Sequence, residues 1–184
     1  MEVYRYDEAH NGYRLEYCDT TLRDYIATRN GKLGFAARNR IALQFLHGVN
    51  YLHHERLLHR DISLQNIPLK VFDSGAVLVK LSDFGLVKDQ SSQFTRTQTE
   101  MKGTVRNPTL SSFRHYGVAN EIHAIGHVLA YIFTGRESLP PATDEVGRII
   151  HQCAVNDVGQ RYQAVSDPIA EVERLVAAPV QTTP

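Results

Sequence analysis

The 184-residue chain contains no tryptophan, two cysteines and no excess of either charge, because 20 basic residues balance 20 acidic ones. The zero formal net charge gives no electrostatic basis for binding nucleic acid or an anionic membrane surface. Cys18 and Cys153 are too few for a disulfide framework or a zinc-ligand pattern, and the nine histidines lack metal-ligand spacing. We interpret both cysteines as free thiols in a reducing compartment.

Long apolar runs are also absent. No run approaches the roughly 20 residues that are needed to span a bilayer, and residues 1–12 lack the basic-then-apolar arrangement of a secretory signal. We therefore expect a cytoplasmic protein without membrane contact. The composition, 42% apolar and 22% charged, is typical of one globular domain.

Hydrophobic periodicity predicts a mainly α-helical fold with short β-hairpins. Asn11-Gly12 between two β-prone runs predicts an N-terminal hairpin, which would be marginally stable in water without a larger sheet or a helical surface. The second strand of a later hairpin is nearly continuously apolar, so we expect it to be buried. The predicted helices span 22–29, 35–55, 121–134, 144–153 and 168–178, and the predicted strands span 3–6, 13–17, 67–71 and 76–81.

Residues 89–112 are polar, lack periodicity and are too many for an ordinary connection. Long segments of this kind in compact domains are usually functional or disordered. We expect the tail, residues 179–184, to be flexible.

Three short motifs carry the chemistry. His59–Asn66 fits the pattern H-R-D-x-x-x-x-N, Asp83-Phe84-Gly85 follows the apolar strand, and Gly103-Thr104 follows the polar segment. Taken alone, the first fits a loop ion pair better, and the second an ordinary turn. In this order and spacing they resemble the protein kinase family, and the resemblance covers nearly the whole chain.

The resemblance implies that residues 19–178 form the C-terminal lobe of a kinase, preceded by a remnant N-lobe hairpin and hinge in residues 1–18. It implies ATP and magnesium as cofactors and a protein as substrate. Phosphoryl transfer requires positioned groups and neutralised charge. Asp61 would accept the proton of the substrate hydroxyl, while Asn66 and Asp83 would supply the oxygen ligands that magnesium prefers.

Further roles follow from the resemblance by position. Arg60 would face the activation segment, residues 83–109. A phosphate there would pair with Arg60, although a solvated polar loop is an equally good interpretation. The candidate phosphorylation sites are Ser91, Ser92, Thr95, Thr97 and Thr99. His59 and Phe84 would pack together between the two loops, and Arg161 would brace the activation segment. Leu15 resembles the gatekeeper residue before the hinge. The adenine site would be formed by Glu16, Tyr17, Cys18 and Pro68, the last in place of the usual aliphatic residue.

The chain departs from the family pattern most clearly by what it lacks. It contains no G-x-G-x-x-G motif and no lysine before Lys32. The phosphates of a bound ATP would therefore lack the glycine-rich loop that covers them and the lysine that neutralises their charge. Ser63 stands where a lysine is usual, Glu121 replaces an aspartate, and Asn107-Pro108-Thr109 replaces Ala-Pro-Glu. The retained catalytic and metal-binding residues point to a divergent kinase.

Three hypotheses remain open. The first is a phosphotransferase that moves the γ-phosphate of Mg-ATP to a protein serine or threonine, the class that Gly103-Thr104 resembles. It would need an N-lobe, supplied by a longer polypeptide or by a partner chain. The second is a pseudokinase or docking module, whose exposed upper face around Leu15 would favour a dimer or a partner. The third is a truncated, inactive product.

Overall fold

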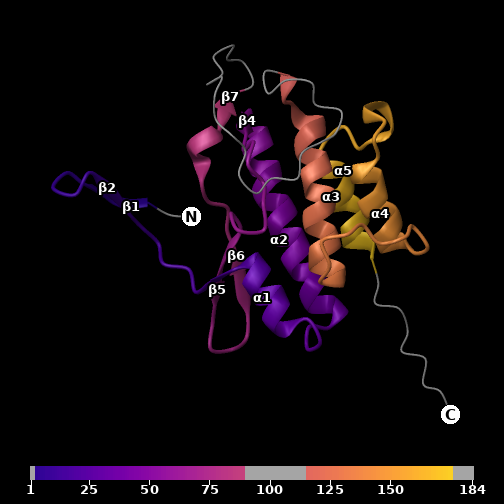
Figure 1. The fold of residues 1–184 in the computed structure, drawn as a ribbon, viewed down its shortest axis with the longest axis horizontal. Helices are drawn as coiled ribbons and strands as arrows, with labels where there is room; N and C mark the ends of the chain where they lie inside the picture. Colours follow the sequence, from indigo (N-terminus) through magenta and orange to yellow (C-terminus); the bar gives the residue numbers. More distant parts are fainter. Residues whose placement is uncertain (1–2, 90–114, 176–184) are drawn as a thin grey trace.

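The computed structural model describes residues 3–89 and 115–175 and confirms a mainly helical fold with small antiparallel sheets (Figure 1). Within these residues, no helix combines the length and the apolar character that crossing a membrane requires. The helices are α1 (Leu22–Arg29), α2 (Phe35–His54), α3 (Val118–Thr134), α4 (Glu145–Ala154) and α5 (Ser166–Arg174). The strands are β1 (Val3–Asp7), β2 (Gly12–Leu15), β3 (Thr20–Thr21), β4 (Leu57–Leu58), β5 (Pro68–Val71), β6 (Val77–Val79) and β7 (Lys88–Asp89).

The core lies between α2 and α3, which run side by side at the centre (Figure 1). Helix α5 packs on α2, and α4 packs on α3. Phe45 of α2 and Ile125 of α3 are fully buried, and each such side chain contributes about 1.5–3 kcal/mol of burial free energy. Gly126 allows the close approach of α4, because a Cβ atom there would lie 2.8 Å from the Cβ of Cys153.

Local capping sets the helix starts. The Thr21 hydroxyl accepts the Asp24 N–H at the start of α1 (3.2 Å). Helix α3 begins at Val118, three residues before the predicted start at 121, because the Asn120 side chain accepts the Gly117 N–H (2.9 Å) and closes the first turn. This cap keeps residue 121 inside the helix.

The last helix was misplaced by the sequence-based prediction. Helix α5 starts at Ser166 and ends at Arg174, not at 168–178, and Leu175 is extended. Pro168 lies in the first turn, where no intrahelical partner exists for a backbone N–H, so the helix accommodates it. The predicted tail, residues 179–184, lies outside the described residues.

The N-terminal hairpin β1–β2 projects away from the helical body (Figure 1). Asn11 adopts the left-handed conformation that the predicted turn requires (φ 47°). Tyr6 and Tyr13 are cross-strand neighbours with ring centroids 5.0 Å apart, and both are exposed. In the described part of the chain these two strands pair with no third strand.

The second hairpin, β5–β6, extends with β3 into a three-stranded sheet in the order β3-β5-β6. The expectation that its second strand is buried is wrong, because Val77 and Val79 are half-buried and Leu78 is exposed. Strand β6 is an edge strand that leans on α2 with one side. The Gln44 side chain of α2 donates to the Val77 carbonyl (3.1 Å) and accepts the Val79 N–H (3.0 Å).

Candidate active site

The β5–β6 hairpin brings Asn66 beside Asp83. Asn66 lies before β5 and Asp83 follows β6, so the two ends of one hairpin carry them. The Asn66 carbonyl accepts the N–H of Ser82 (3.0 Å) and its hydroxyl (3.3 Å). Since Ser82 immediately precedes Asp83, this contact joins the two predicted metal-binding segments.

Asn66 also holds Asp61. Its amide nitrogen donates to the Asp61 carboxylate (2.9 Å) and to the Asp61 carbonyl (2.9 Å). A carboxylate and a carbonyl only accept hydrogen bonds, so Asn66 must present its nitrogen to Asp61. The amide oxygen is then the atom of Asn66 that can coordinate a cation.

His59 connects the loop of Asp61 to the segment of Asp83. Its Nε2–H donates to the Ser82 carbonyl (2.9 Å), and its Nδ1 accepts the N–H of Asp61 (3.3 Å). The His59 and Phe84 rings lie 5.2 Å apart between centroids, so the predicted contact is present. Phe84 nevertheless remains 43% exposed, so its ring is only partly covered by neighbouring residues.

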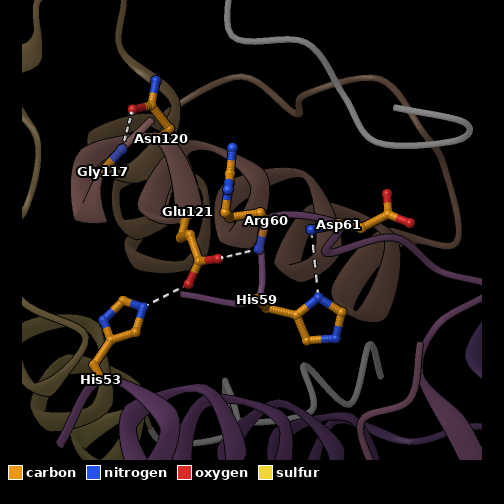
Figure 2. Close-up of polar contacts among 7 residues, drawn as sticks. All are labelled: His53, His59, Arg60, Asp61, Gly117, Asn120 and Glu121. Atoms are coloured by element: carbon orange, nitrogen blue, oxygen red, sulfur yellow. Dashed lines mark hydrogen bonds and ion pairs between the residues drawn. The ribbon is translucent and has the colours of Figure 1, made fainter. Parts of the chain in front are cut away.

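A buried carboxylate anchors residues 59–66, the predicted catalytic loop (Figure 2). Glu121 of α3 is fully buried; one of its oxygens accepts the Arg60 N–H (2.6 Å) and the other accepts from Nε2 of His53 (2.6 Å). Arg60 has a positive φ of 67°, a conformation that costs a non-glycine residue free energy and needs support from its surroundings. The Glu121 contact supplies this support, so Glu121 fixes the backbone next to Asp61.

Sequence reasoning identified Glu121 but missed His53. The structure joins them although 68 positions separate them along the chain. The only available signal was the place of His53 in the last turn of α2, shortly before the catalytic loop.

Asp83 is exposed and adopts the left-handed conformation (φ 60°). A Cβ at position 85 would lie 3.3 Å from the Asp83 carboxylate, so glycine keeps the space around that carboxylate open. Amide and carboxylate oxygens from Asn66 and Asp83 fit magnesium. The described residues contain no cluster of three or more His, Cys, Asp or Glu side chains suited to a metal ion. The two-residue set thus needs further oxygens, which magnesium usually takes from water and substrate phosphate.

The predicted hinge residues have different surroundings. Tyr17 is exposed and Leu15 is 43% exposed, whereas Glu16 is buried and forms ion pairs with Lys80 (2.7 Å) and Lys70 (3.8 Å). Burial raises the pKa of the half-buried Cys18 thiol. The Glu16 pairs fasten the predicted hinge residues to the β5–β6 hairpin that leads to Asp83.

Pro68, the first residue of β5, is buried and pairs with Thr21 of β3; its carbonyl accepts the Lys80 N–H (2.9 Å). Of the predicted adenine residues, Pro68 therefore belongs to the hairpin and Glu16 contacts it.

Arg161 joins two helices, while its predicted contact with the activation segment falls largely outside the described residues. Its buried guanidinium donates to the carbonyls of Val155 (2.6 Å) and Ala119 (2.9 Å), so it joins the end of α4 to the start of α3. Most of the predicted activation segment lies outside the described residues, including the candidate phosphorylation sites Ser91, Ser92, Thr95, Thr97 and Thr99, Gly103-Thr104 and Asn107-Pro108-Thr109.

Helix α3 carries a buried histidine next to a second one. His123 is 4% exposed, its Nδ1 has no hydrogen-bond partner among the described residues, and its ring lies 5.0 Å from that of His127. Burial first, then the neighbouring His127 and Arg161, lower the pKa of His123 from 6.5 to about 4. The folded state therefore keeps His123 neutral at pH values where the unfolded chain takes up a proton.

We expect the free energy of unfolding to fall as the pH drops from about 6.5 towards 4, because only the unfolded state binds the proton in this window. The His123 contribution to the slope approaches about 1.4 kcal/mol per pH unit. His123→Gln should flatten the profile measured by urea denaturation, whereas His54→Gln, at an exposed position, should not. An unchanged slope in His123→Gln would contradict the prediction.

A protein family model matches nearly the whole chain. Residues 2–178 match the family model described as the protein kinase domain. The chain is 32% identical over 124 residues to calmodulin-binding receptor-like cytoplasmic kinase 3 of Arabidopsis thaliana, an alignment that covers 63% of this chain and 24% of that protein.

Two further relatives carry serine/threonine kinase names. The chain is 30% identical over 138 residues to LRR receptor-like serine/threonine-protein kinase ER2 of Oryza sativa subsp. japonica (72% of this chain, 14% of that protein). It is 30% identical over 172 residues to serine/threonine-protein kinase MAK of Rattus norvegicus (90% of this chain, 27% of that protein). The chain thus spans between 14% and 27% of the length of these curated relatives.

Proposed function

The chain belongs to the protein kinase family, and we propose that it is the catalytic-loop half of an enzyme that transfers the γ-phosphate of Mg-ATP to a protein serine or threonine hydroxyl. One observation carries the proposal. Asn66 donates its amide hydrogens to Asp61 and accepts from Ser82 with its carbonyl, so a single residue links the acid–base group to the segment that carries Asp83.

The residues have separate tasks in this proposal. The Asp61 carboxylate accepts the proton of the substrate hydroxyl as the oxygen attacks phosphorus. Asn66 and Asp83 hold magnesium, which when bound neutralises charge on the phosphates. His59 and Glu121 keep the loop in place without touching the substrate, through Ser82 and Arg60 respectively.

ATP is proposed to meet the hinge, residues 16–18, with Pro68 beneath the adenine. The ion pair between Glu16 and Lys80 would then keep the hinge at a constant distance from the strand that leads to Asp83. Binding of the base and binding of the metal would be coupled through β6.

The phosphate lid and its lysine have no counterpart in residues 1–184, which hold no G-x-G-x-x-G motif and no lysine before Lys32. We propose that polypeptide outside these residues, in the same protein or in a partner, supplies them. The exposed Tyr4, Tyr6 and Tyr13 of β1–β2 offer an apolar surface that such a lobe would cover. Residues 1–18 would then connect the two lobes, and residues 19–178 would form the C-terminal lobe.

The alternative is a pseudokinase or docking module that binds proteins without transferring phosphate. The missing lysine and the 43% exposure of Phe84 favour it. For either function we propose a cytoplasmic location, because Cys18 and Cys153 are free thiols.

Thermal unfolding with and without Mg-ATP tests the metal site. Ligand at about 100 times its dissociation constant stabilises a protein by roughly 2.7 kcal/mol, so the wild type should melt at a higher temperature with Mg-ATP. Asp83→Asn should abolish this shift, and Asp73→Asn, in the exposed turn of the β5–β6 hairpin, should keep it. Equal shifts in Asp83→Asn and the wild type would contradict the proposed metal site, and no shift in any of the three would favour the docking alternative.

A further inference from the structure

The outer edge of strand β6 is closed by a side chain of helix α2. In the described part of the chain, β6 has β5 on one side and no strand on the other. Instead, the Gln44 amide of α2 donates to the Val77 carbonyl (3.1 Å) and accepts the Val79 N–H (3.0 Å). A glutamine amide carries both a donor and an acceptor. This one side chain therefore takes the place of a neighbouring strand for two backbone groups.

The strand that Gln44 holds leads directly to Asp83, which follows the end of β6 after three residues. One helical turn after Gln44, α2 meets this connection again. A Cβ atom at Gly48 would lie 3.4 Å from Cδ1 of Leu81, so the buried Leu81 side chain packs on the backbone of α2. Ser82 is then joined to the catalytic loop. Helix α2 thus supports the chain on two successive turns just before the proposed metal ligand.

The same helix also supports the loop of Asp61. His53, nine residues after Gln44 on α2, lies 2.6 Å from Glu121. Glu121 in turn accepts the N–H of Arg60, next to Asp61. Because an α-helix rises 1.5 Å per residue, the two contacts of α2 lie about 13.5 Å apart along one continuous element. Helix α2 is therefore a common support for the segment of the acid–base group and for the segment of the metal ligand.

We propose that Gln44 is a positioning residue, which fixes the Asp83 carboxylate relative to Asp61 and Asn66 by holding β6 against α2. The inference rests on the proposed function, in which Asp83 holds magnesium beside the acid–base group. Asp83 is itself exposed, so its place depends on the chain that precedes it. Without the two hydrogen bonds of Gln44, β6 would move away from α2 and Asp83 would move with it.

The test replaces Gln44 in two ways. Gln44→Met keeps the length of the side chain but has neither the amide donor nor the amide oxygen, and Gln44→Asn keeps the amide on a side chain that is too short to reach both backbone groups. Gln163→Met is the matched control. Gln163 also donates to two backbone carbonyls, those of Val158 (3.3 Å) and Arg161 (2.8 Å), but it lies in the segment before α5. Circular dichroism identifies the folded variants, and either Gln44 variant alone suffices.

The first measurement needs no ligand. Backbone order parameters of the full chain are determined by NMR relaxation for the amides of Ser82 and Asp83. We expect values near 0.85 in the wild type and in Gln163→Met, as in a rigid backbone, and values falling towards about 0.6 in both Gln44 variants. Order parameters describe the folded state, so a lower free energy of unfolding does not change them by itself.

The second measurement compares the affinity for Mg-ATP with the affinity for ATP in the presence of EDTA. Loss of a residue that orients a metal ligand typically weakens metal binding about 10- to 100-fold. The dissociation constant of Mg-ATP should therefore rise by at least about tenfold in both Gln44 variants, while that of metal-free ATP stays the same. A merely structural role of Gln44 would lower the melting temperature but leave both constants at their wild-type values.

The outcomes separate this inference from the proposed function. Wild-type order parameters at Ser82 and Asp83 in the folded Gln44 variants would overturn the inference. If the wild type and the Gln44 variants bound Mg-ATP equally tightly, the inference would also fail, but the proposed function would stand. If no protein bound Mg-ATP while the Gln44 variants lost order at Asp83, the positioning role of Gln44 would hold and the proposed function would fail.

Discussion

Asp61→Asn is expected to lower the rate of phosphate transfer by about 10²- to 10⁴-fold, the range that general-base catalysis contributes. Asparagine keeps the shape of the side chain. It also keeps an oxygen that can accept the hydrogen bond from the Asn66 amide nitrogen, which lies 2.9 Å from the Asp61 carboxylate in the wild type. What it loses is the ability to take the proton of the acceptor hydroxyl. The measurement is single-turnover transfer of labelled phosphate by the protein, together with the N-lobe polypeptide that the proposal requires.

The affinity for Mg-ATP distinguishes this effect from a damaged site. Because Asn66 and Asp83 hold the metal in the proposed mechanism, Asp61→Asn should bind Mg-ATP as tightly as the wild type, while Asp83→Asn should not. Asp73→Asn serves as the control for removal of a surface charge. Transfer by Asp61→Asn at more than a tenth of the wild-type rate would contradict the assignment of Asp61 as the base.

Glu121→Ala is expected to destabilise the fold by about 2–6 kcal/mol, because it leaves two buried hydrogen-bond donors without an acceptor at about 1–3 kcal/mol each. Alanine would leave the Arg60 N–H and the His53 ring without their shared acceptor inside the core. The positive φ of Arg60 would also lose the contact that holds it. Urea denaturation at pH 7 measures the loss.

Glu173→Ala is the matched control. Glu173 lies on the surface of α5, 3.8 Å from His47, and its side chain is 55% exposed. Exposed ion pairs contribute about 0–1 kcal/mol, so this variant should unfold close to the wild-type midpoint. If Glu121→Ala lost no more stability than Glu173→Ala, the anchoring role of Glu121 would be wrong.

The sequence by itself determined the helical faces and the order of the chemical groups. Ile41, Phe45 and Val49 recur at every fourth position, the spacing of one helical face, and they are buried in α2. Thr21 before α1 and Asn11-Gly12 in the first turn behave as their local chemistry predicts. Such signals are readable because hydrogen bonds and periodicity within a few residues decide them.

Only the tertiary structure decided which distant groups meet. The pairing of His53 with Glu121, the burial of Glu16 against Lys80, and the partial exposure of β6 all depend on elements far apart in the chain. Periodicity tells which face of an element is apolar, but it carries no information about what lies opposite that face. The sequence thus named Asp61, Asn66 and Asp83 as candidates, whereas the β5–β6 hairpin and its contacts with the catalytic loop brought them together.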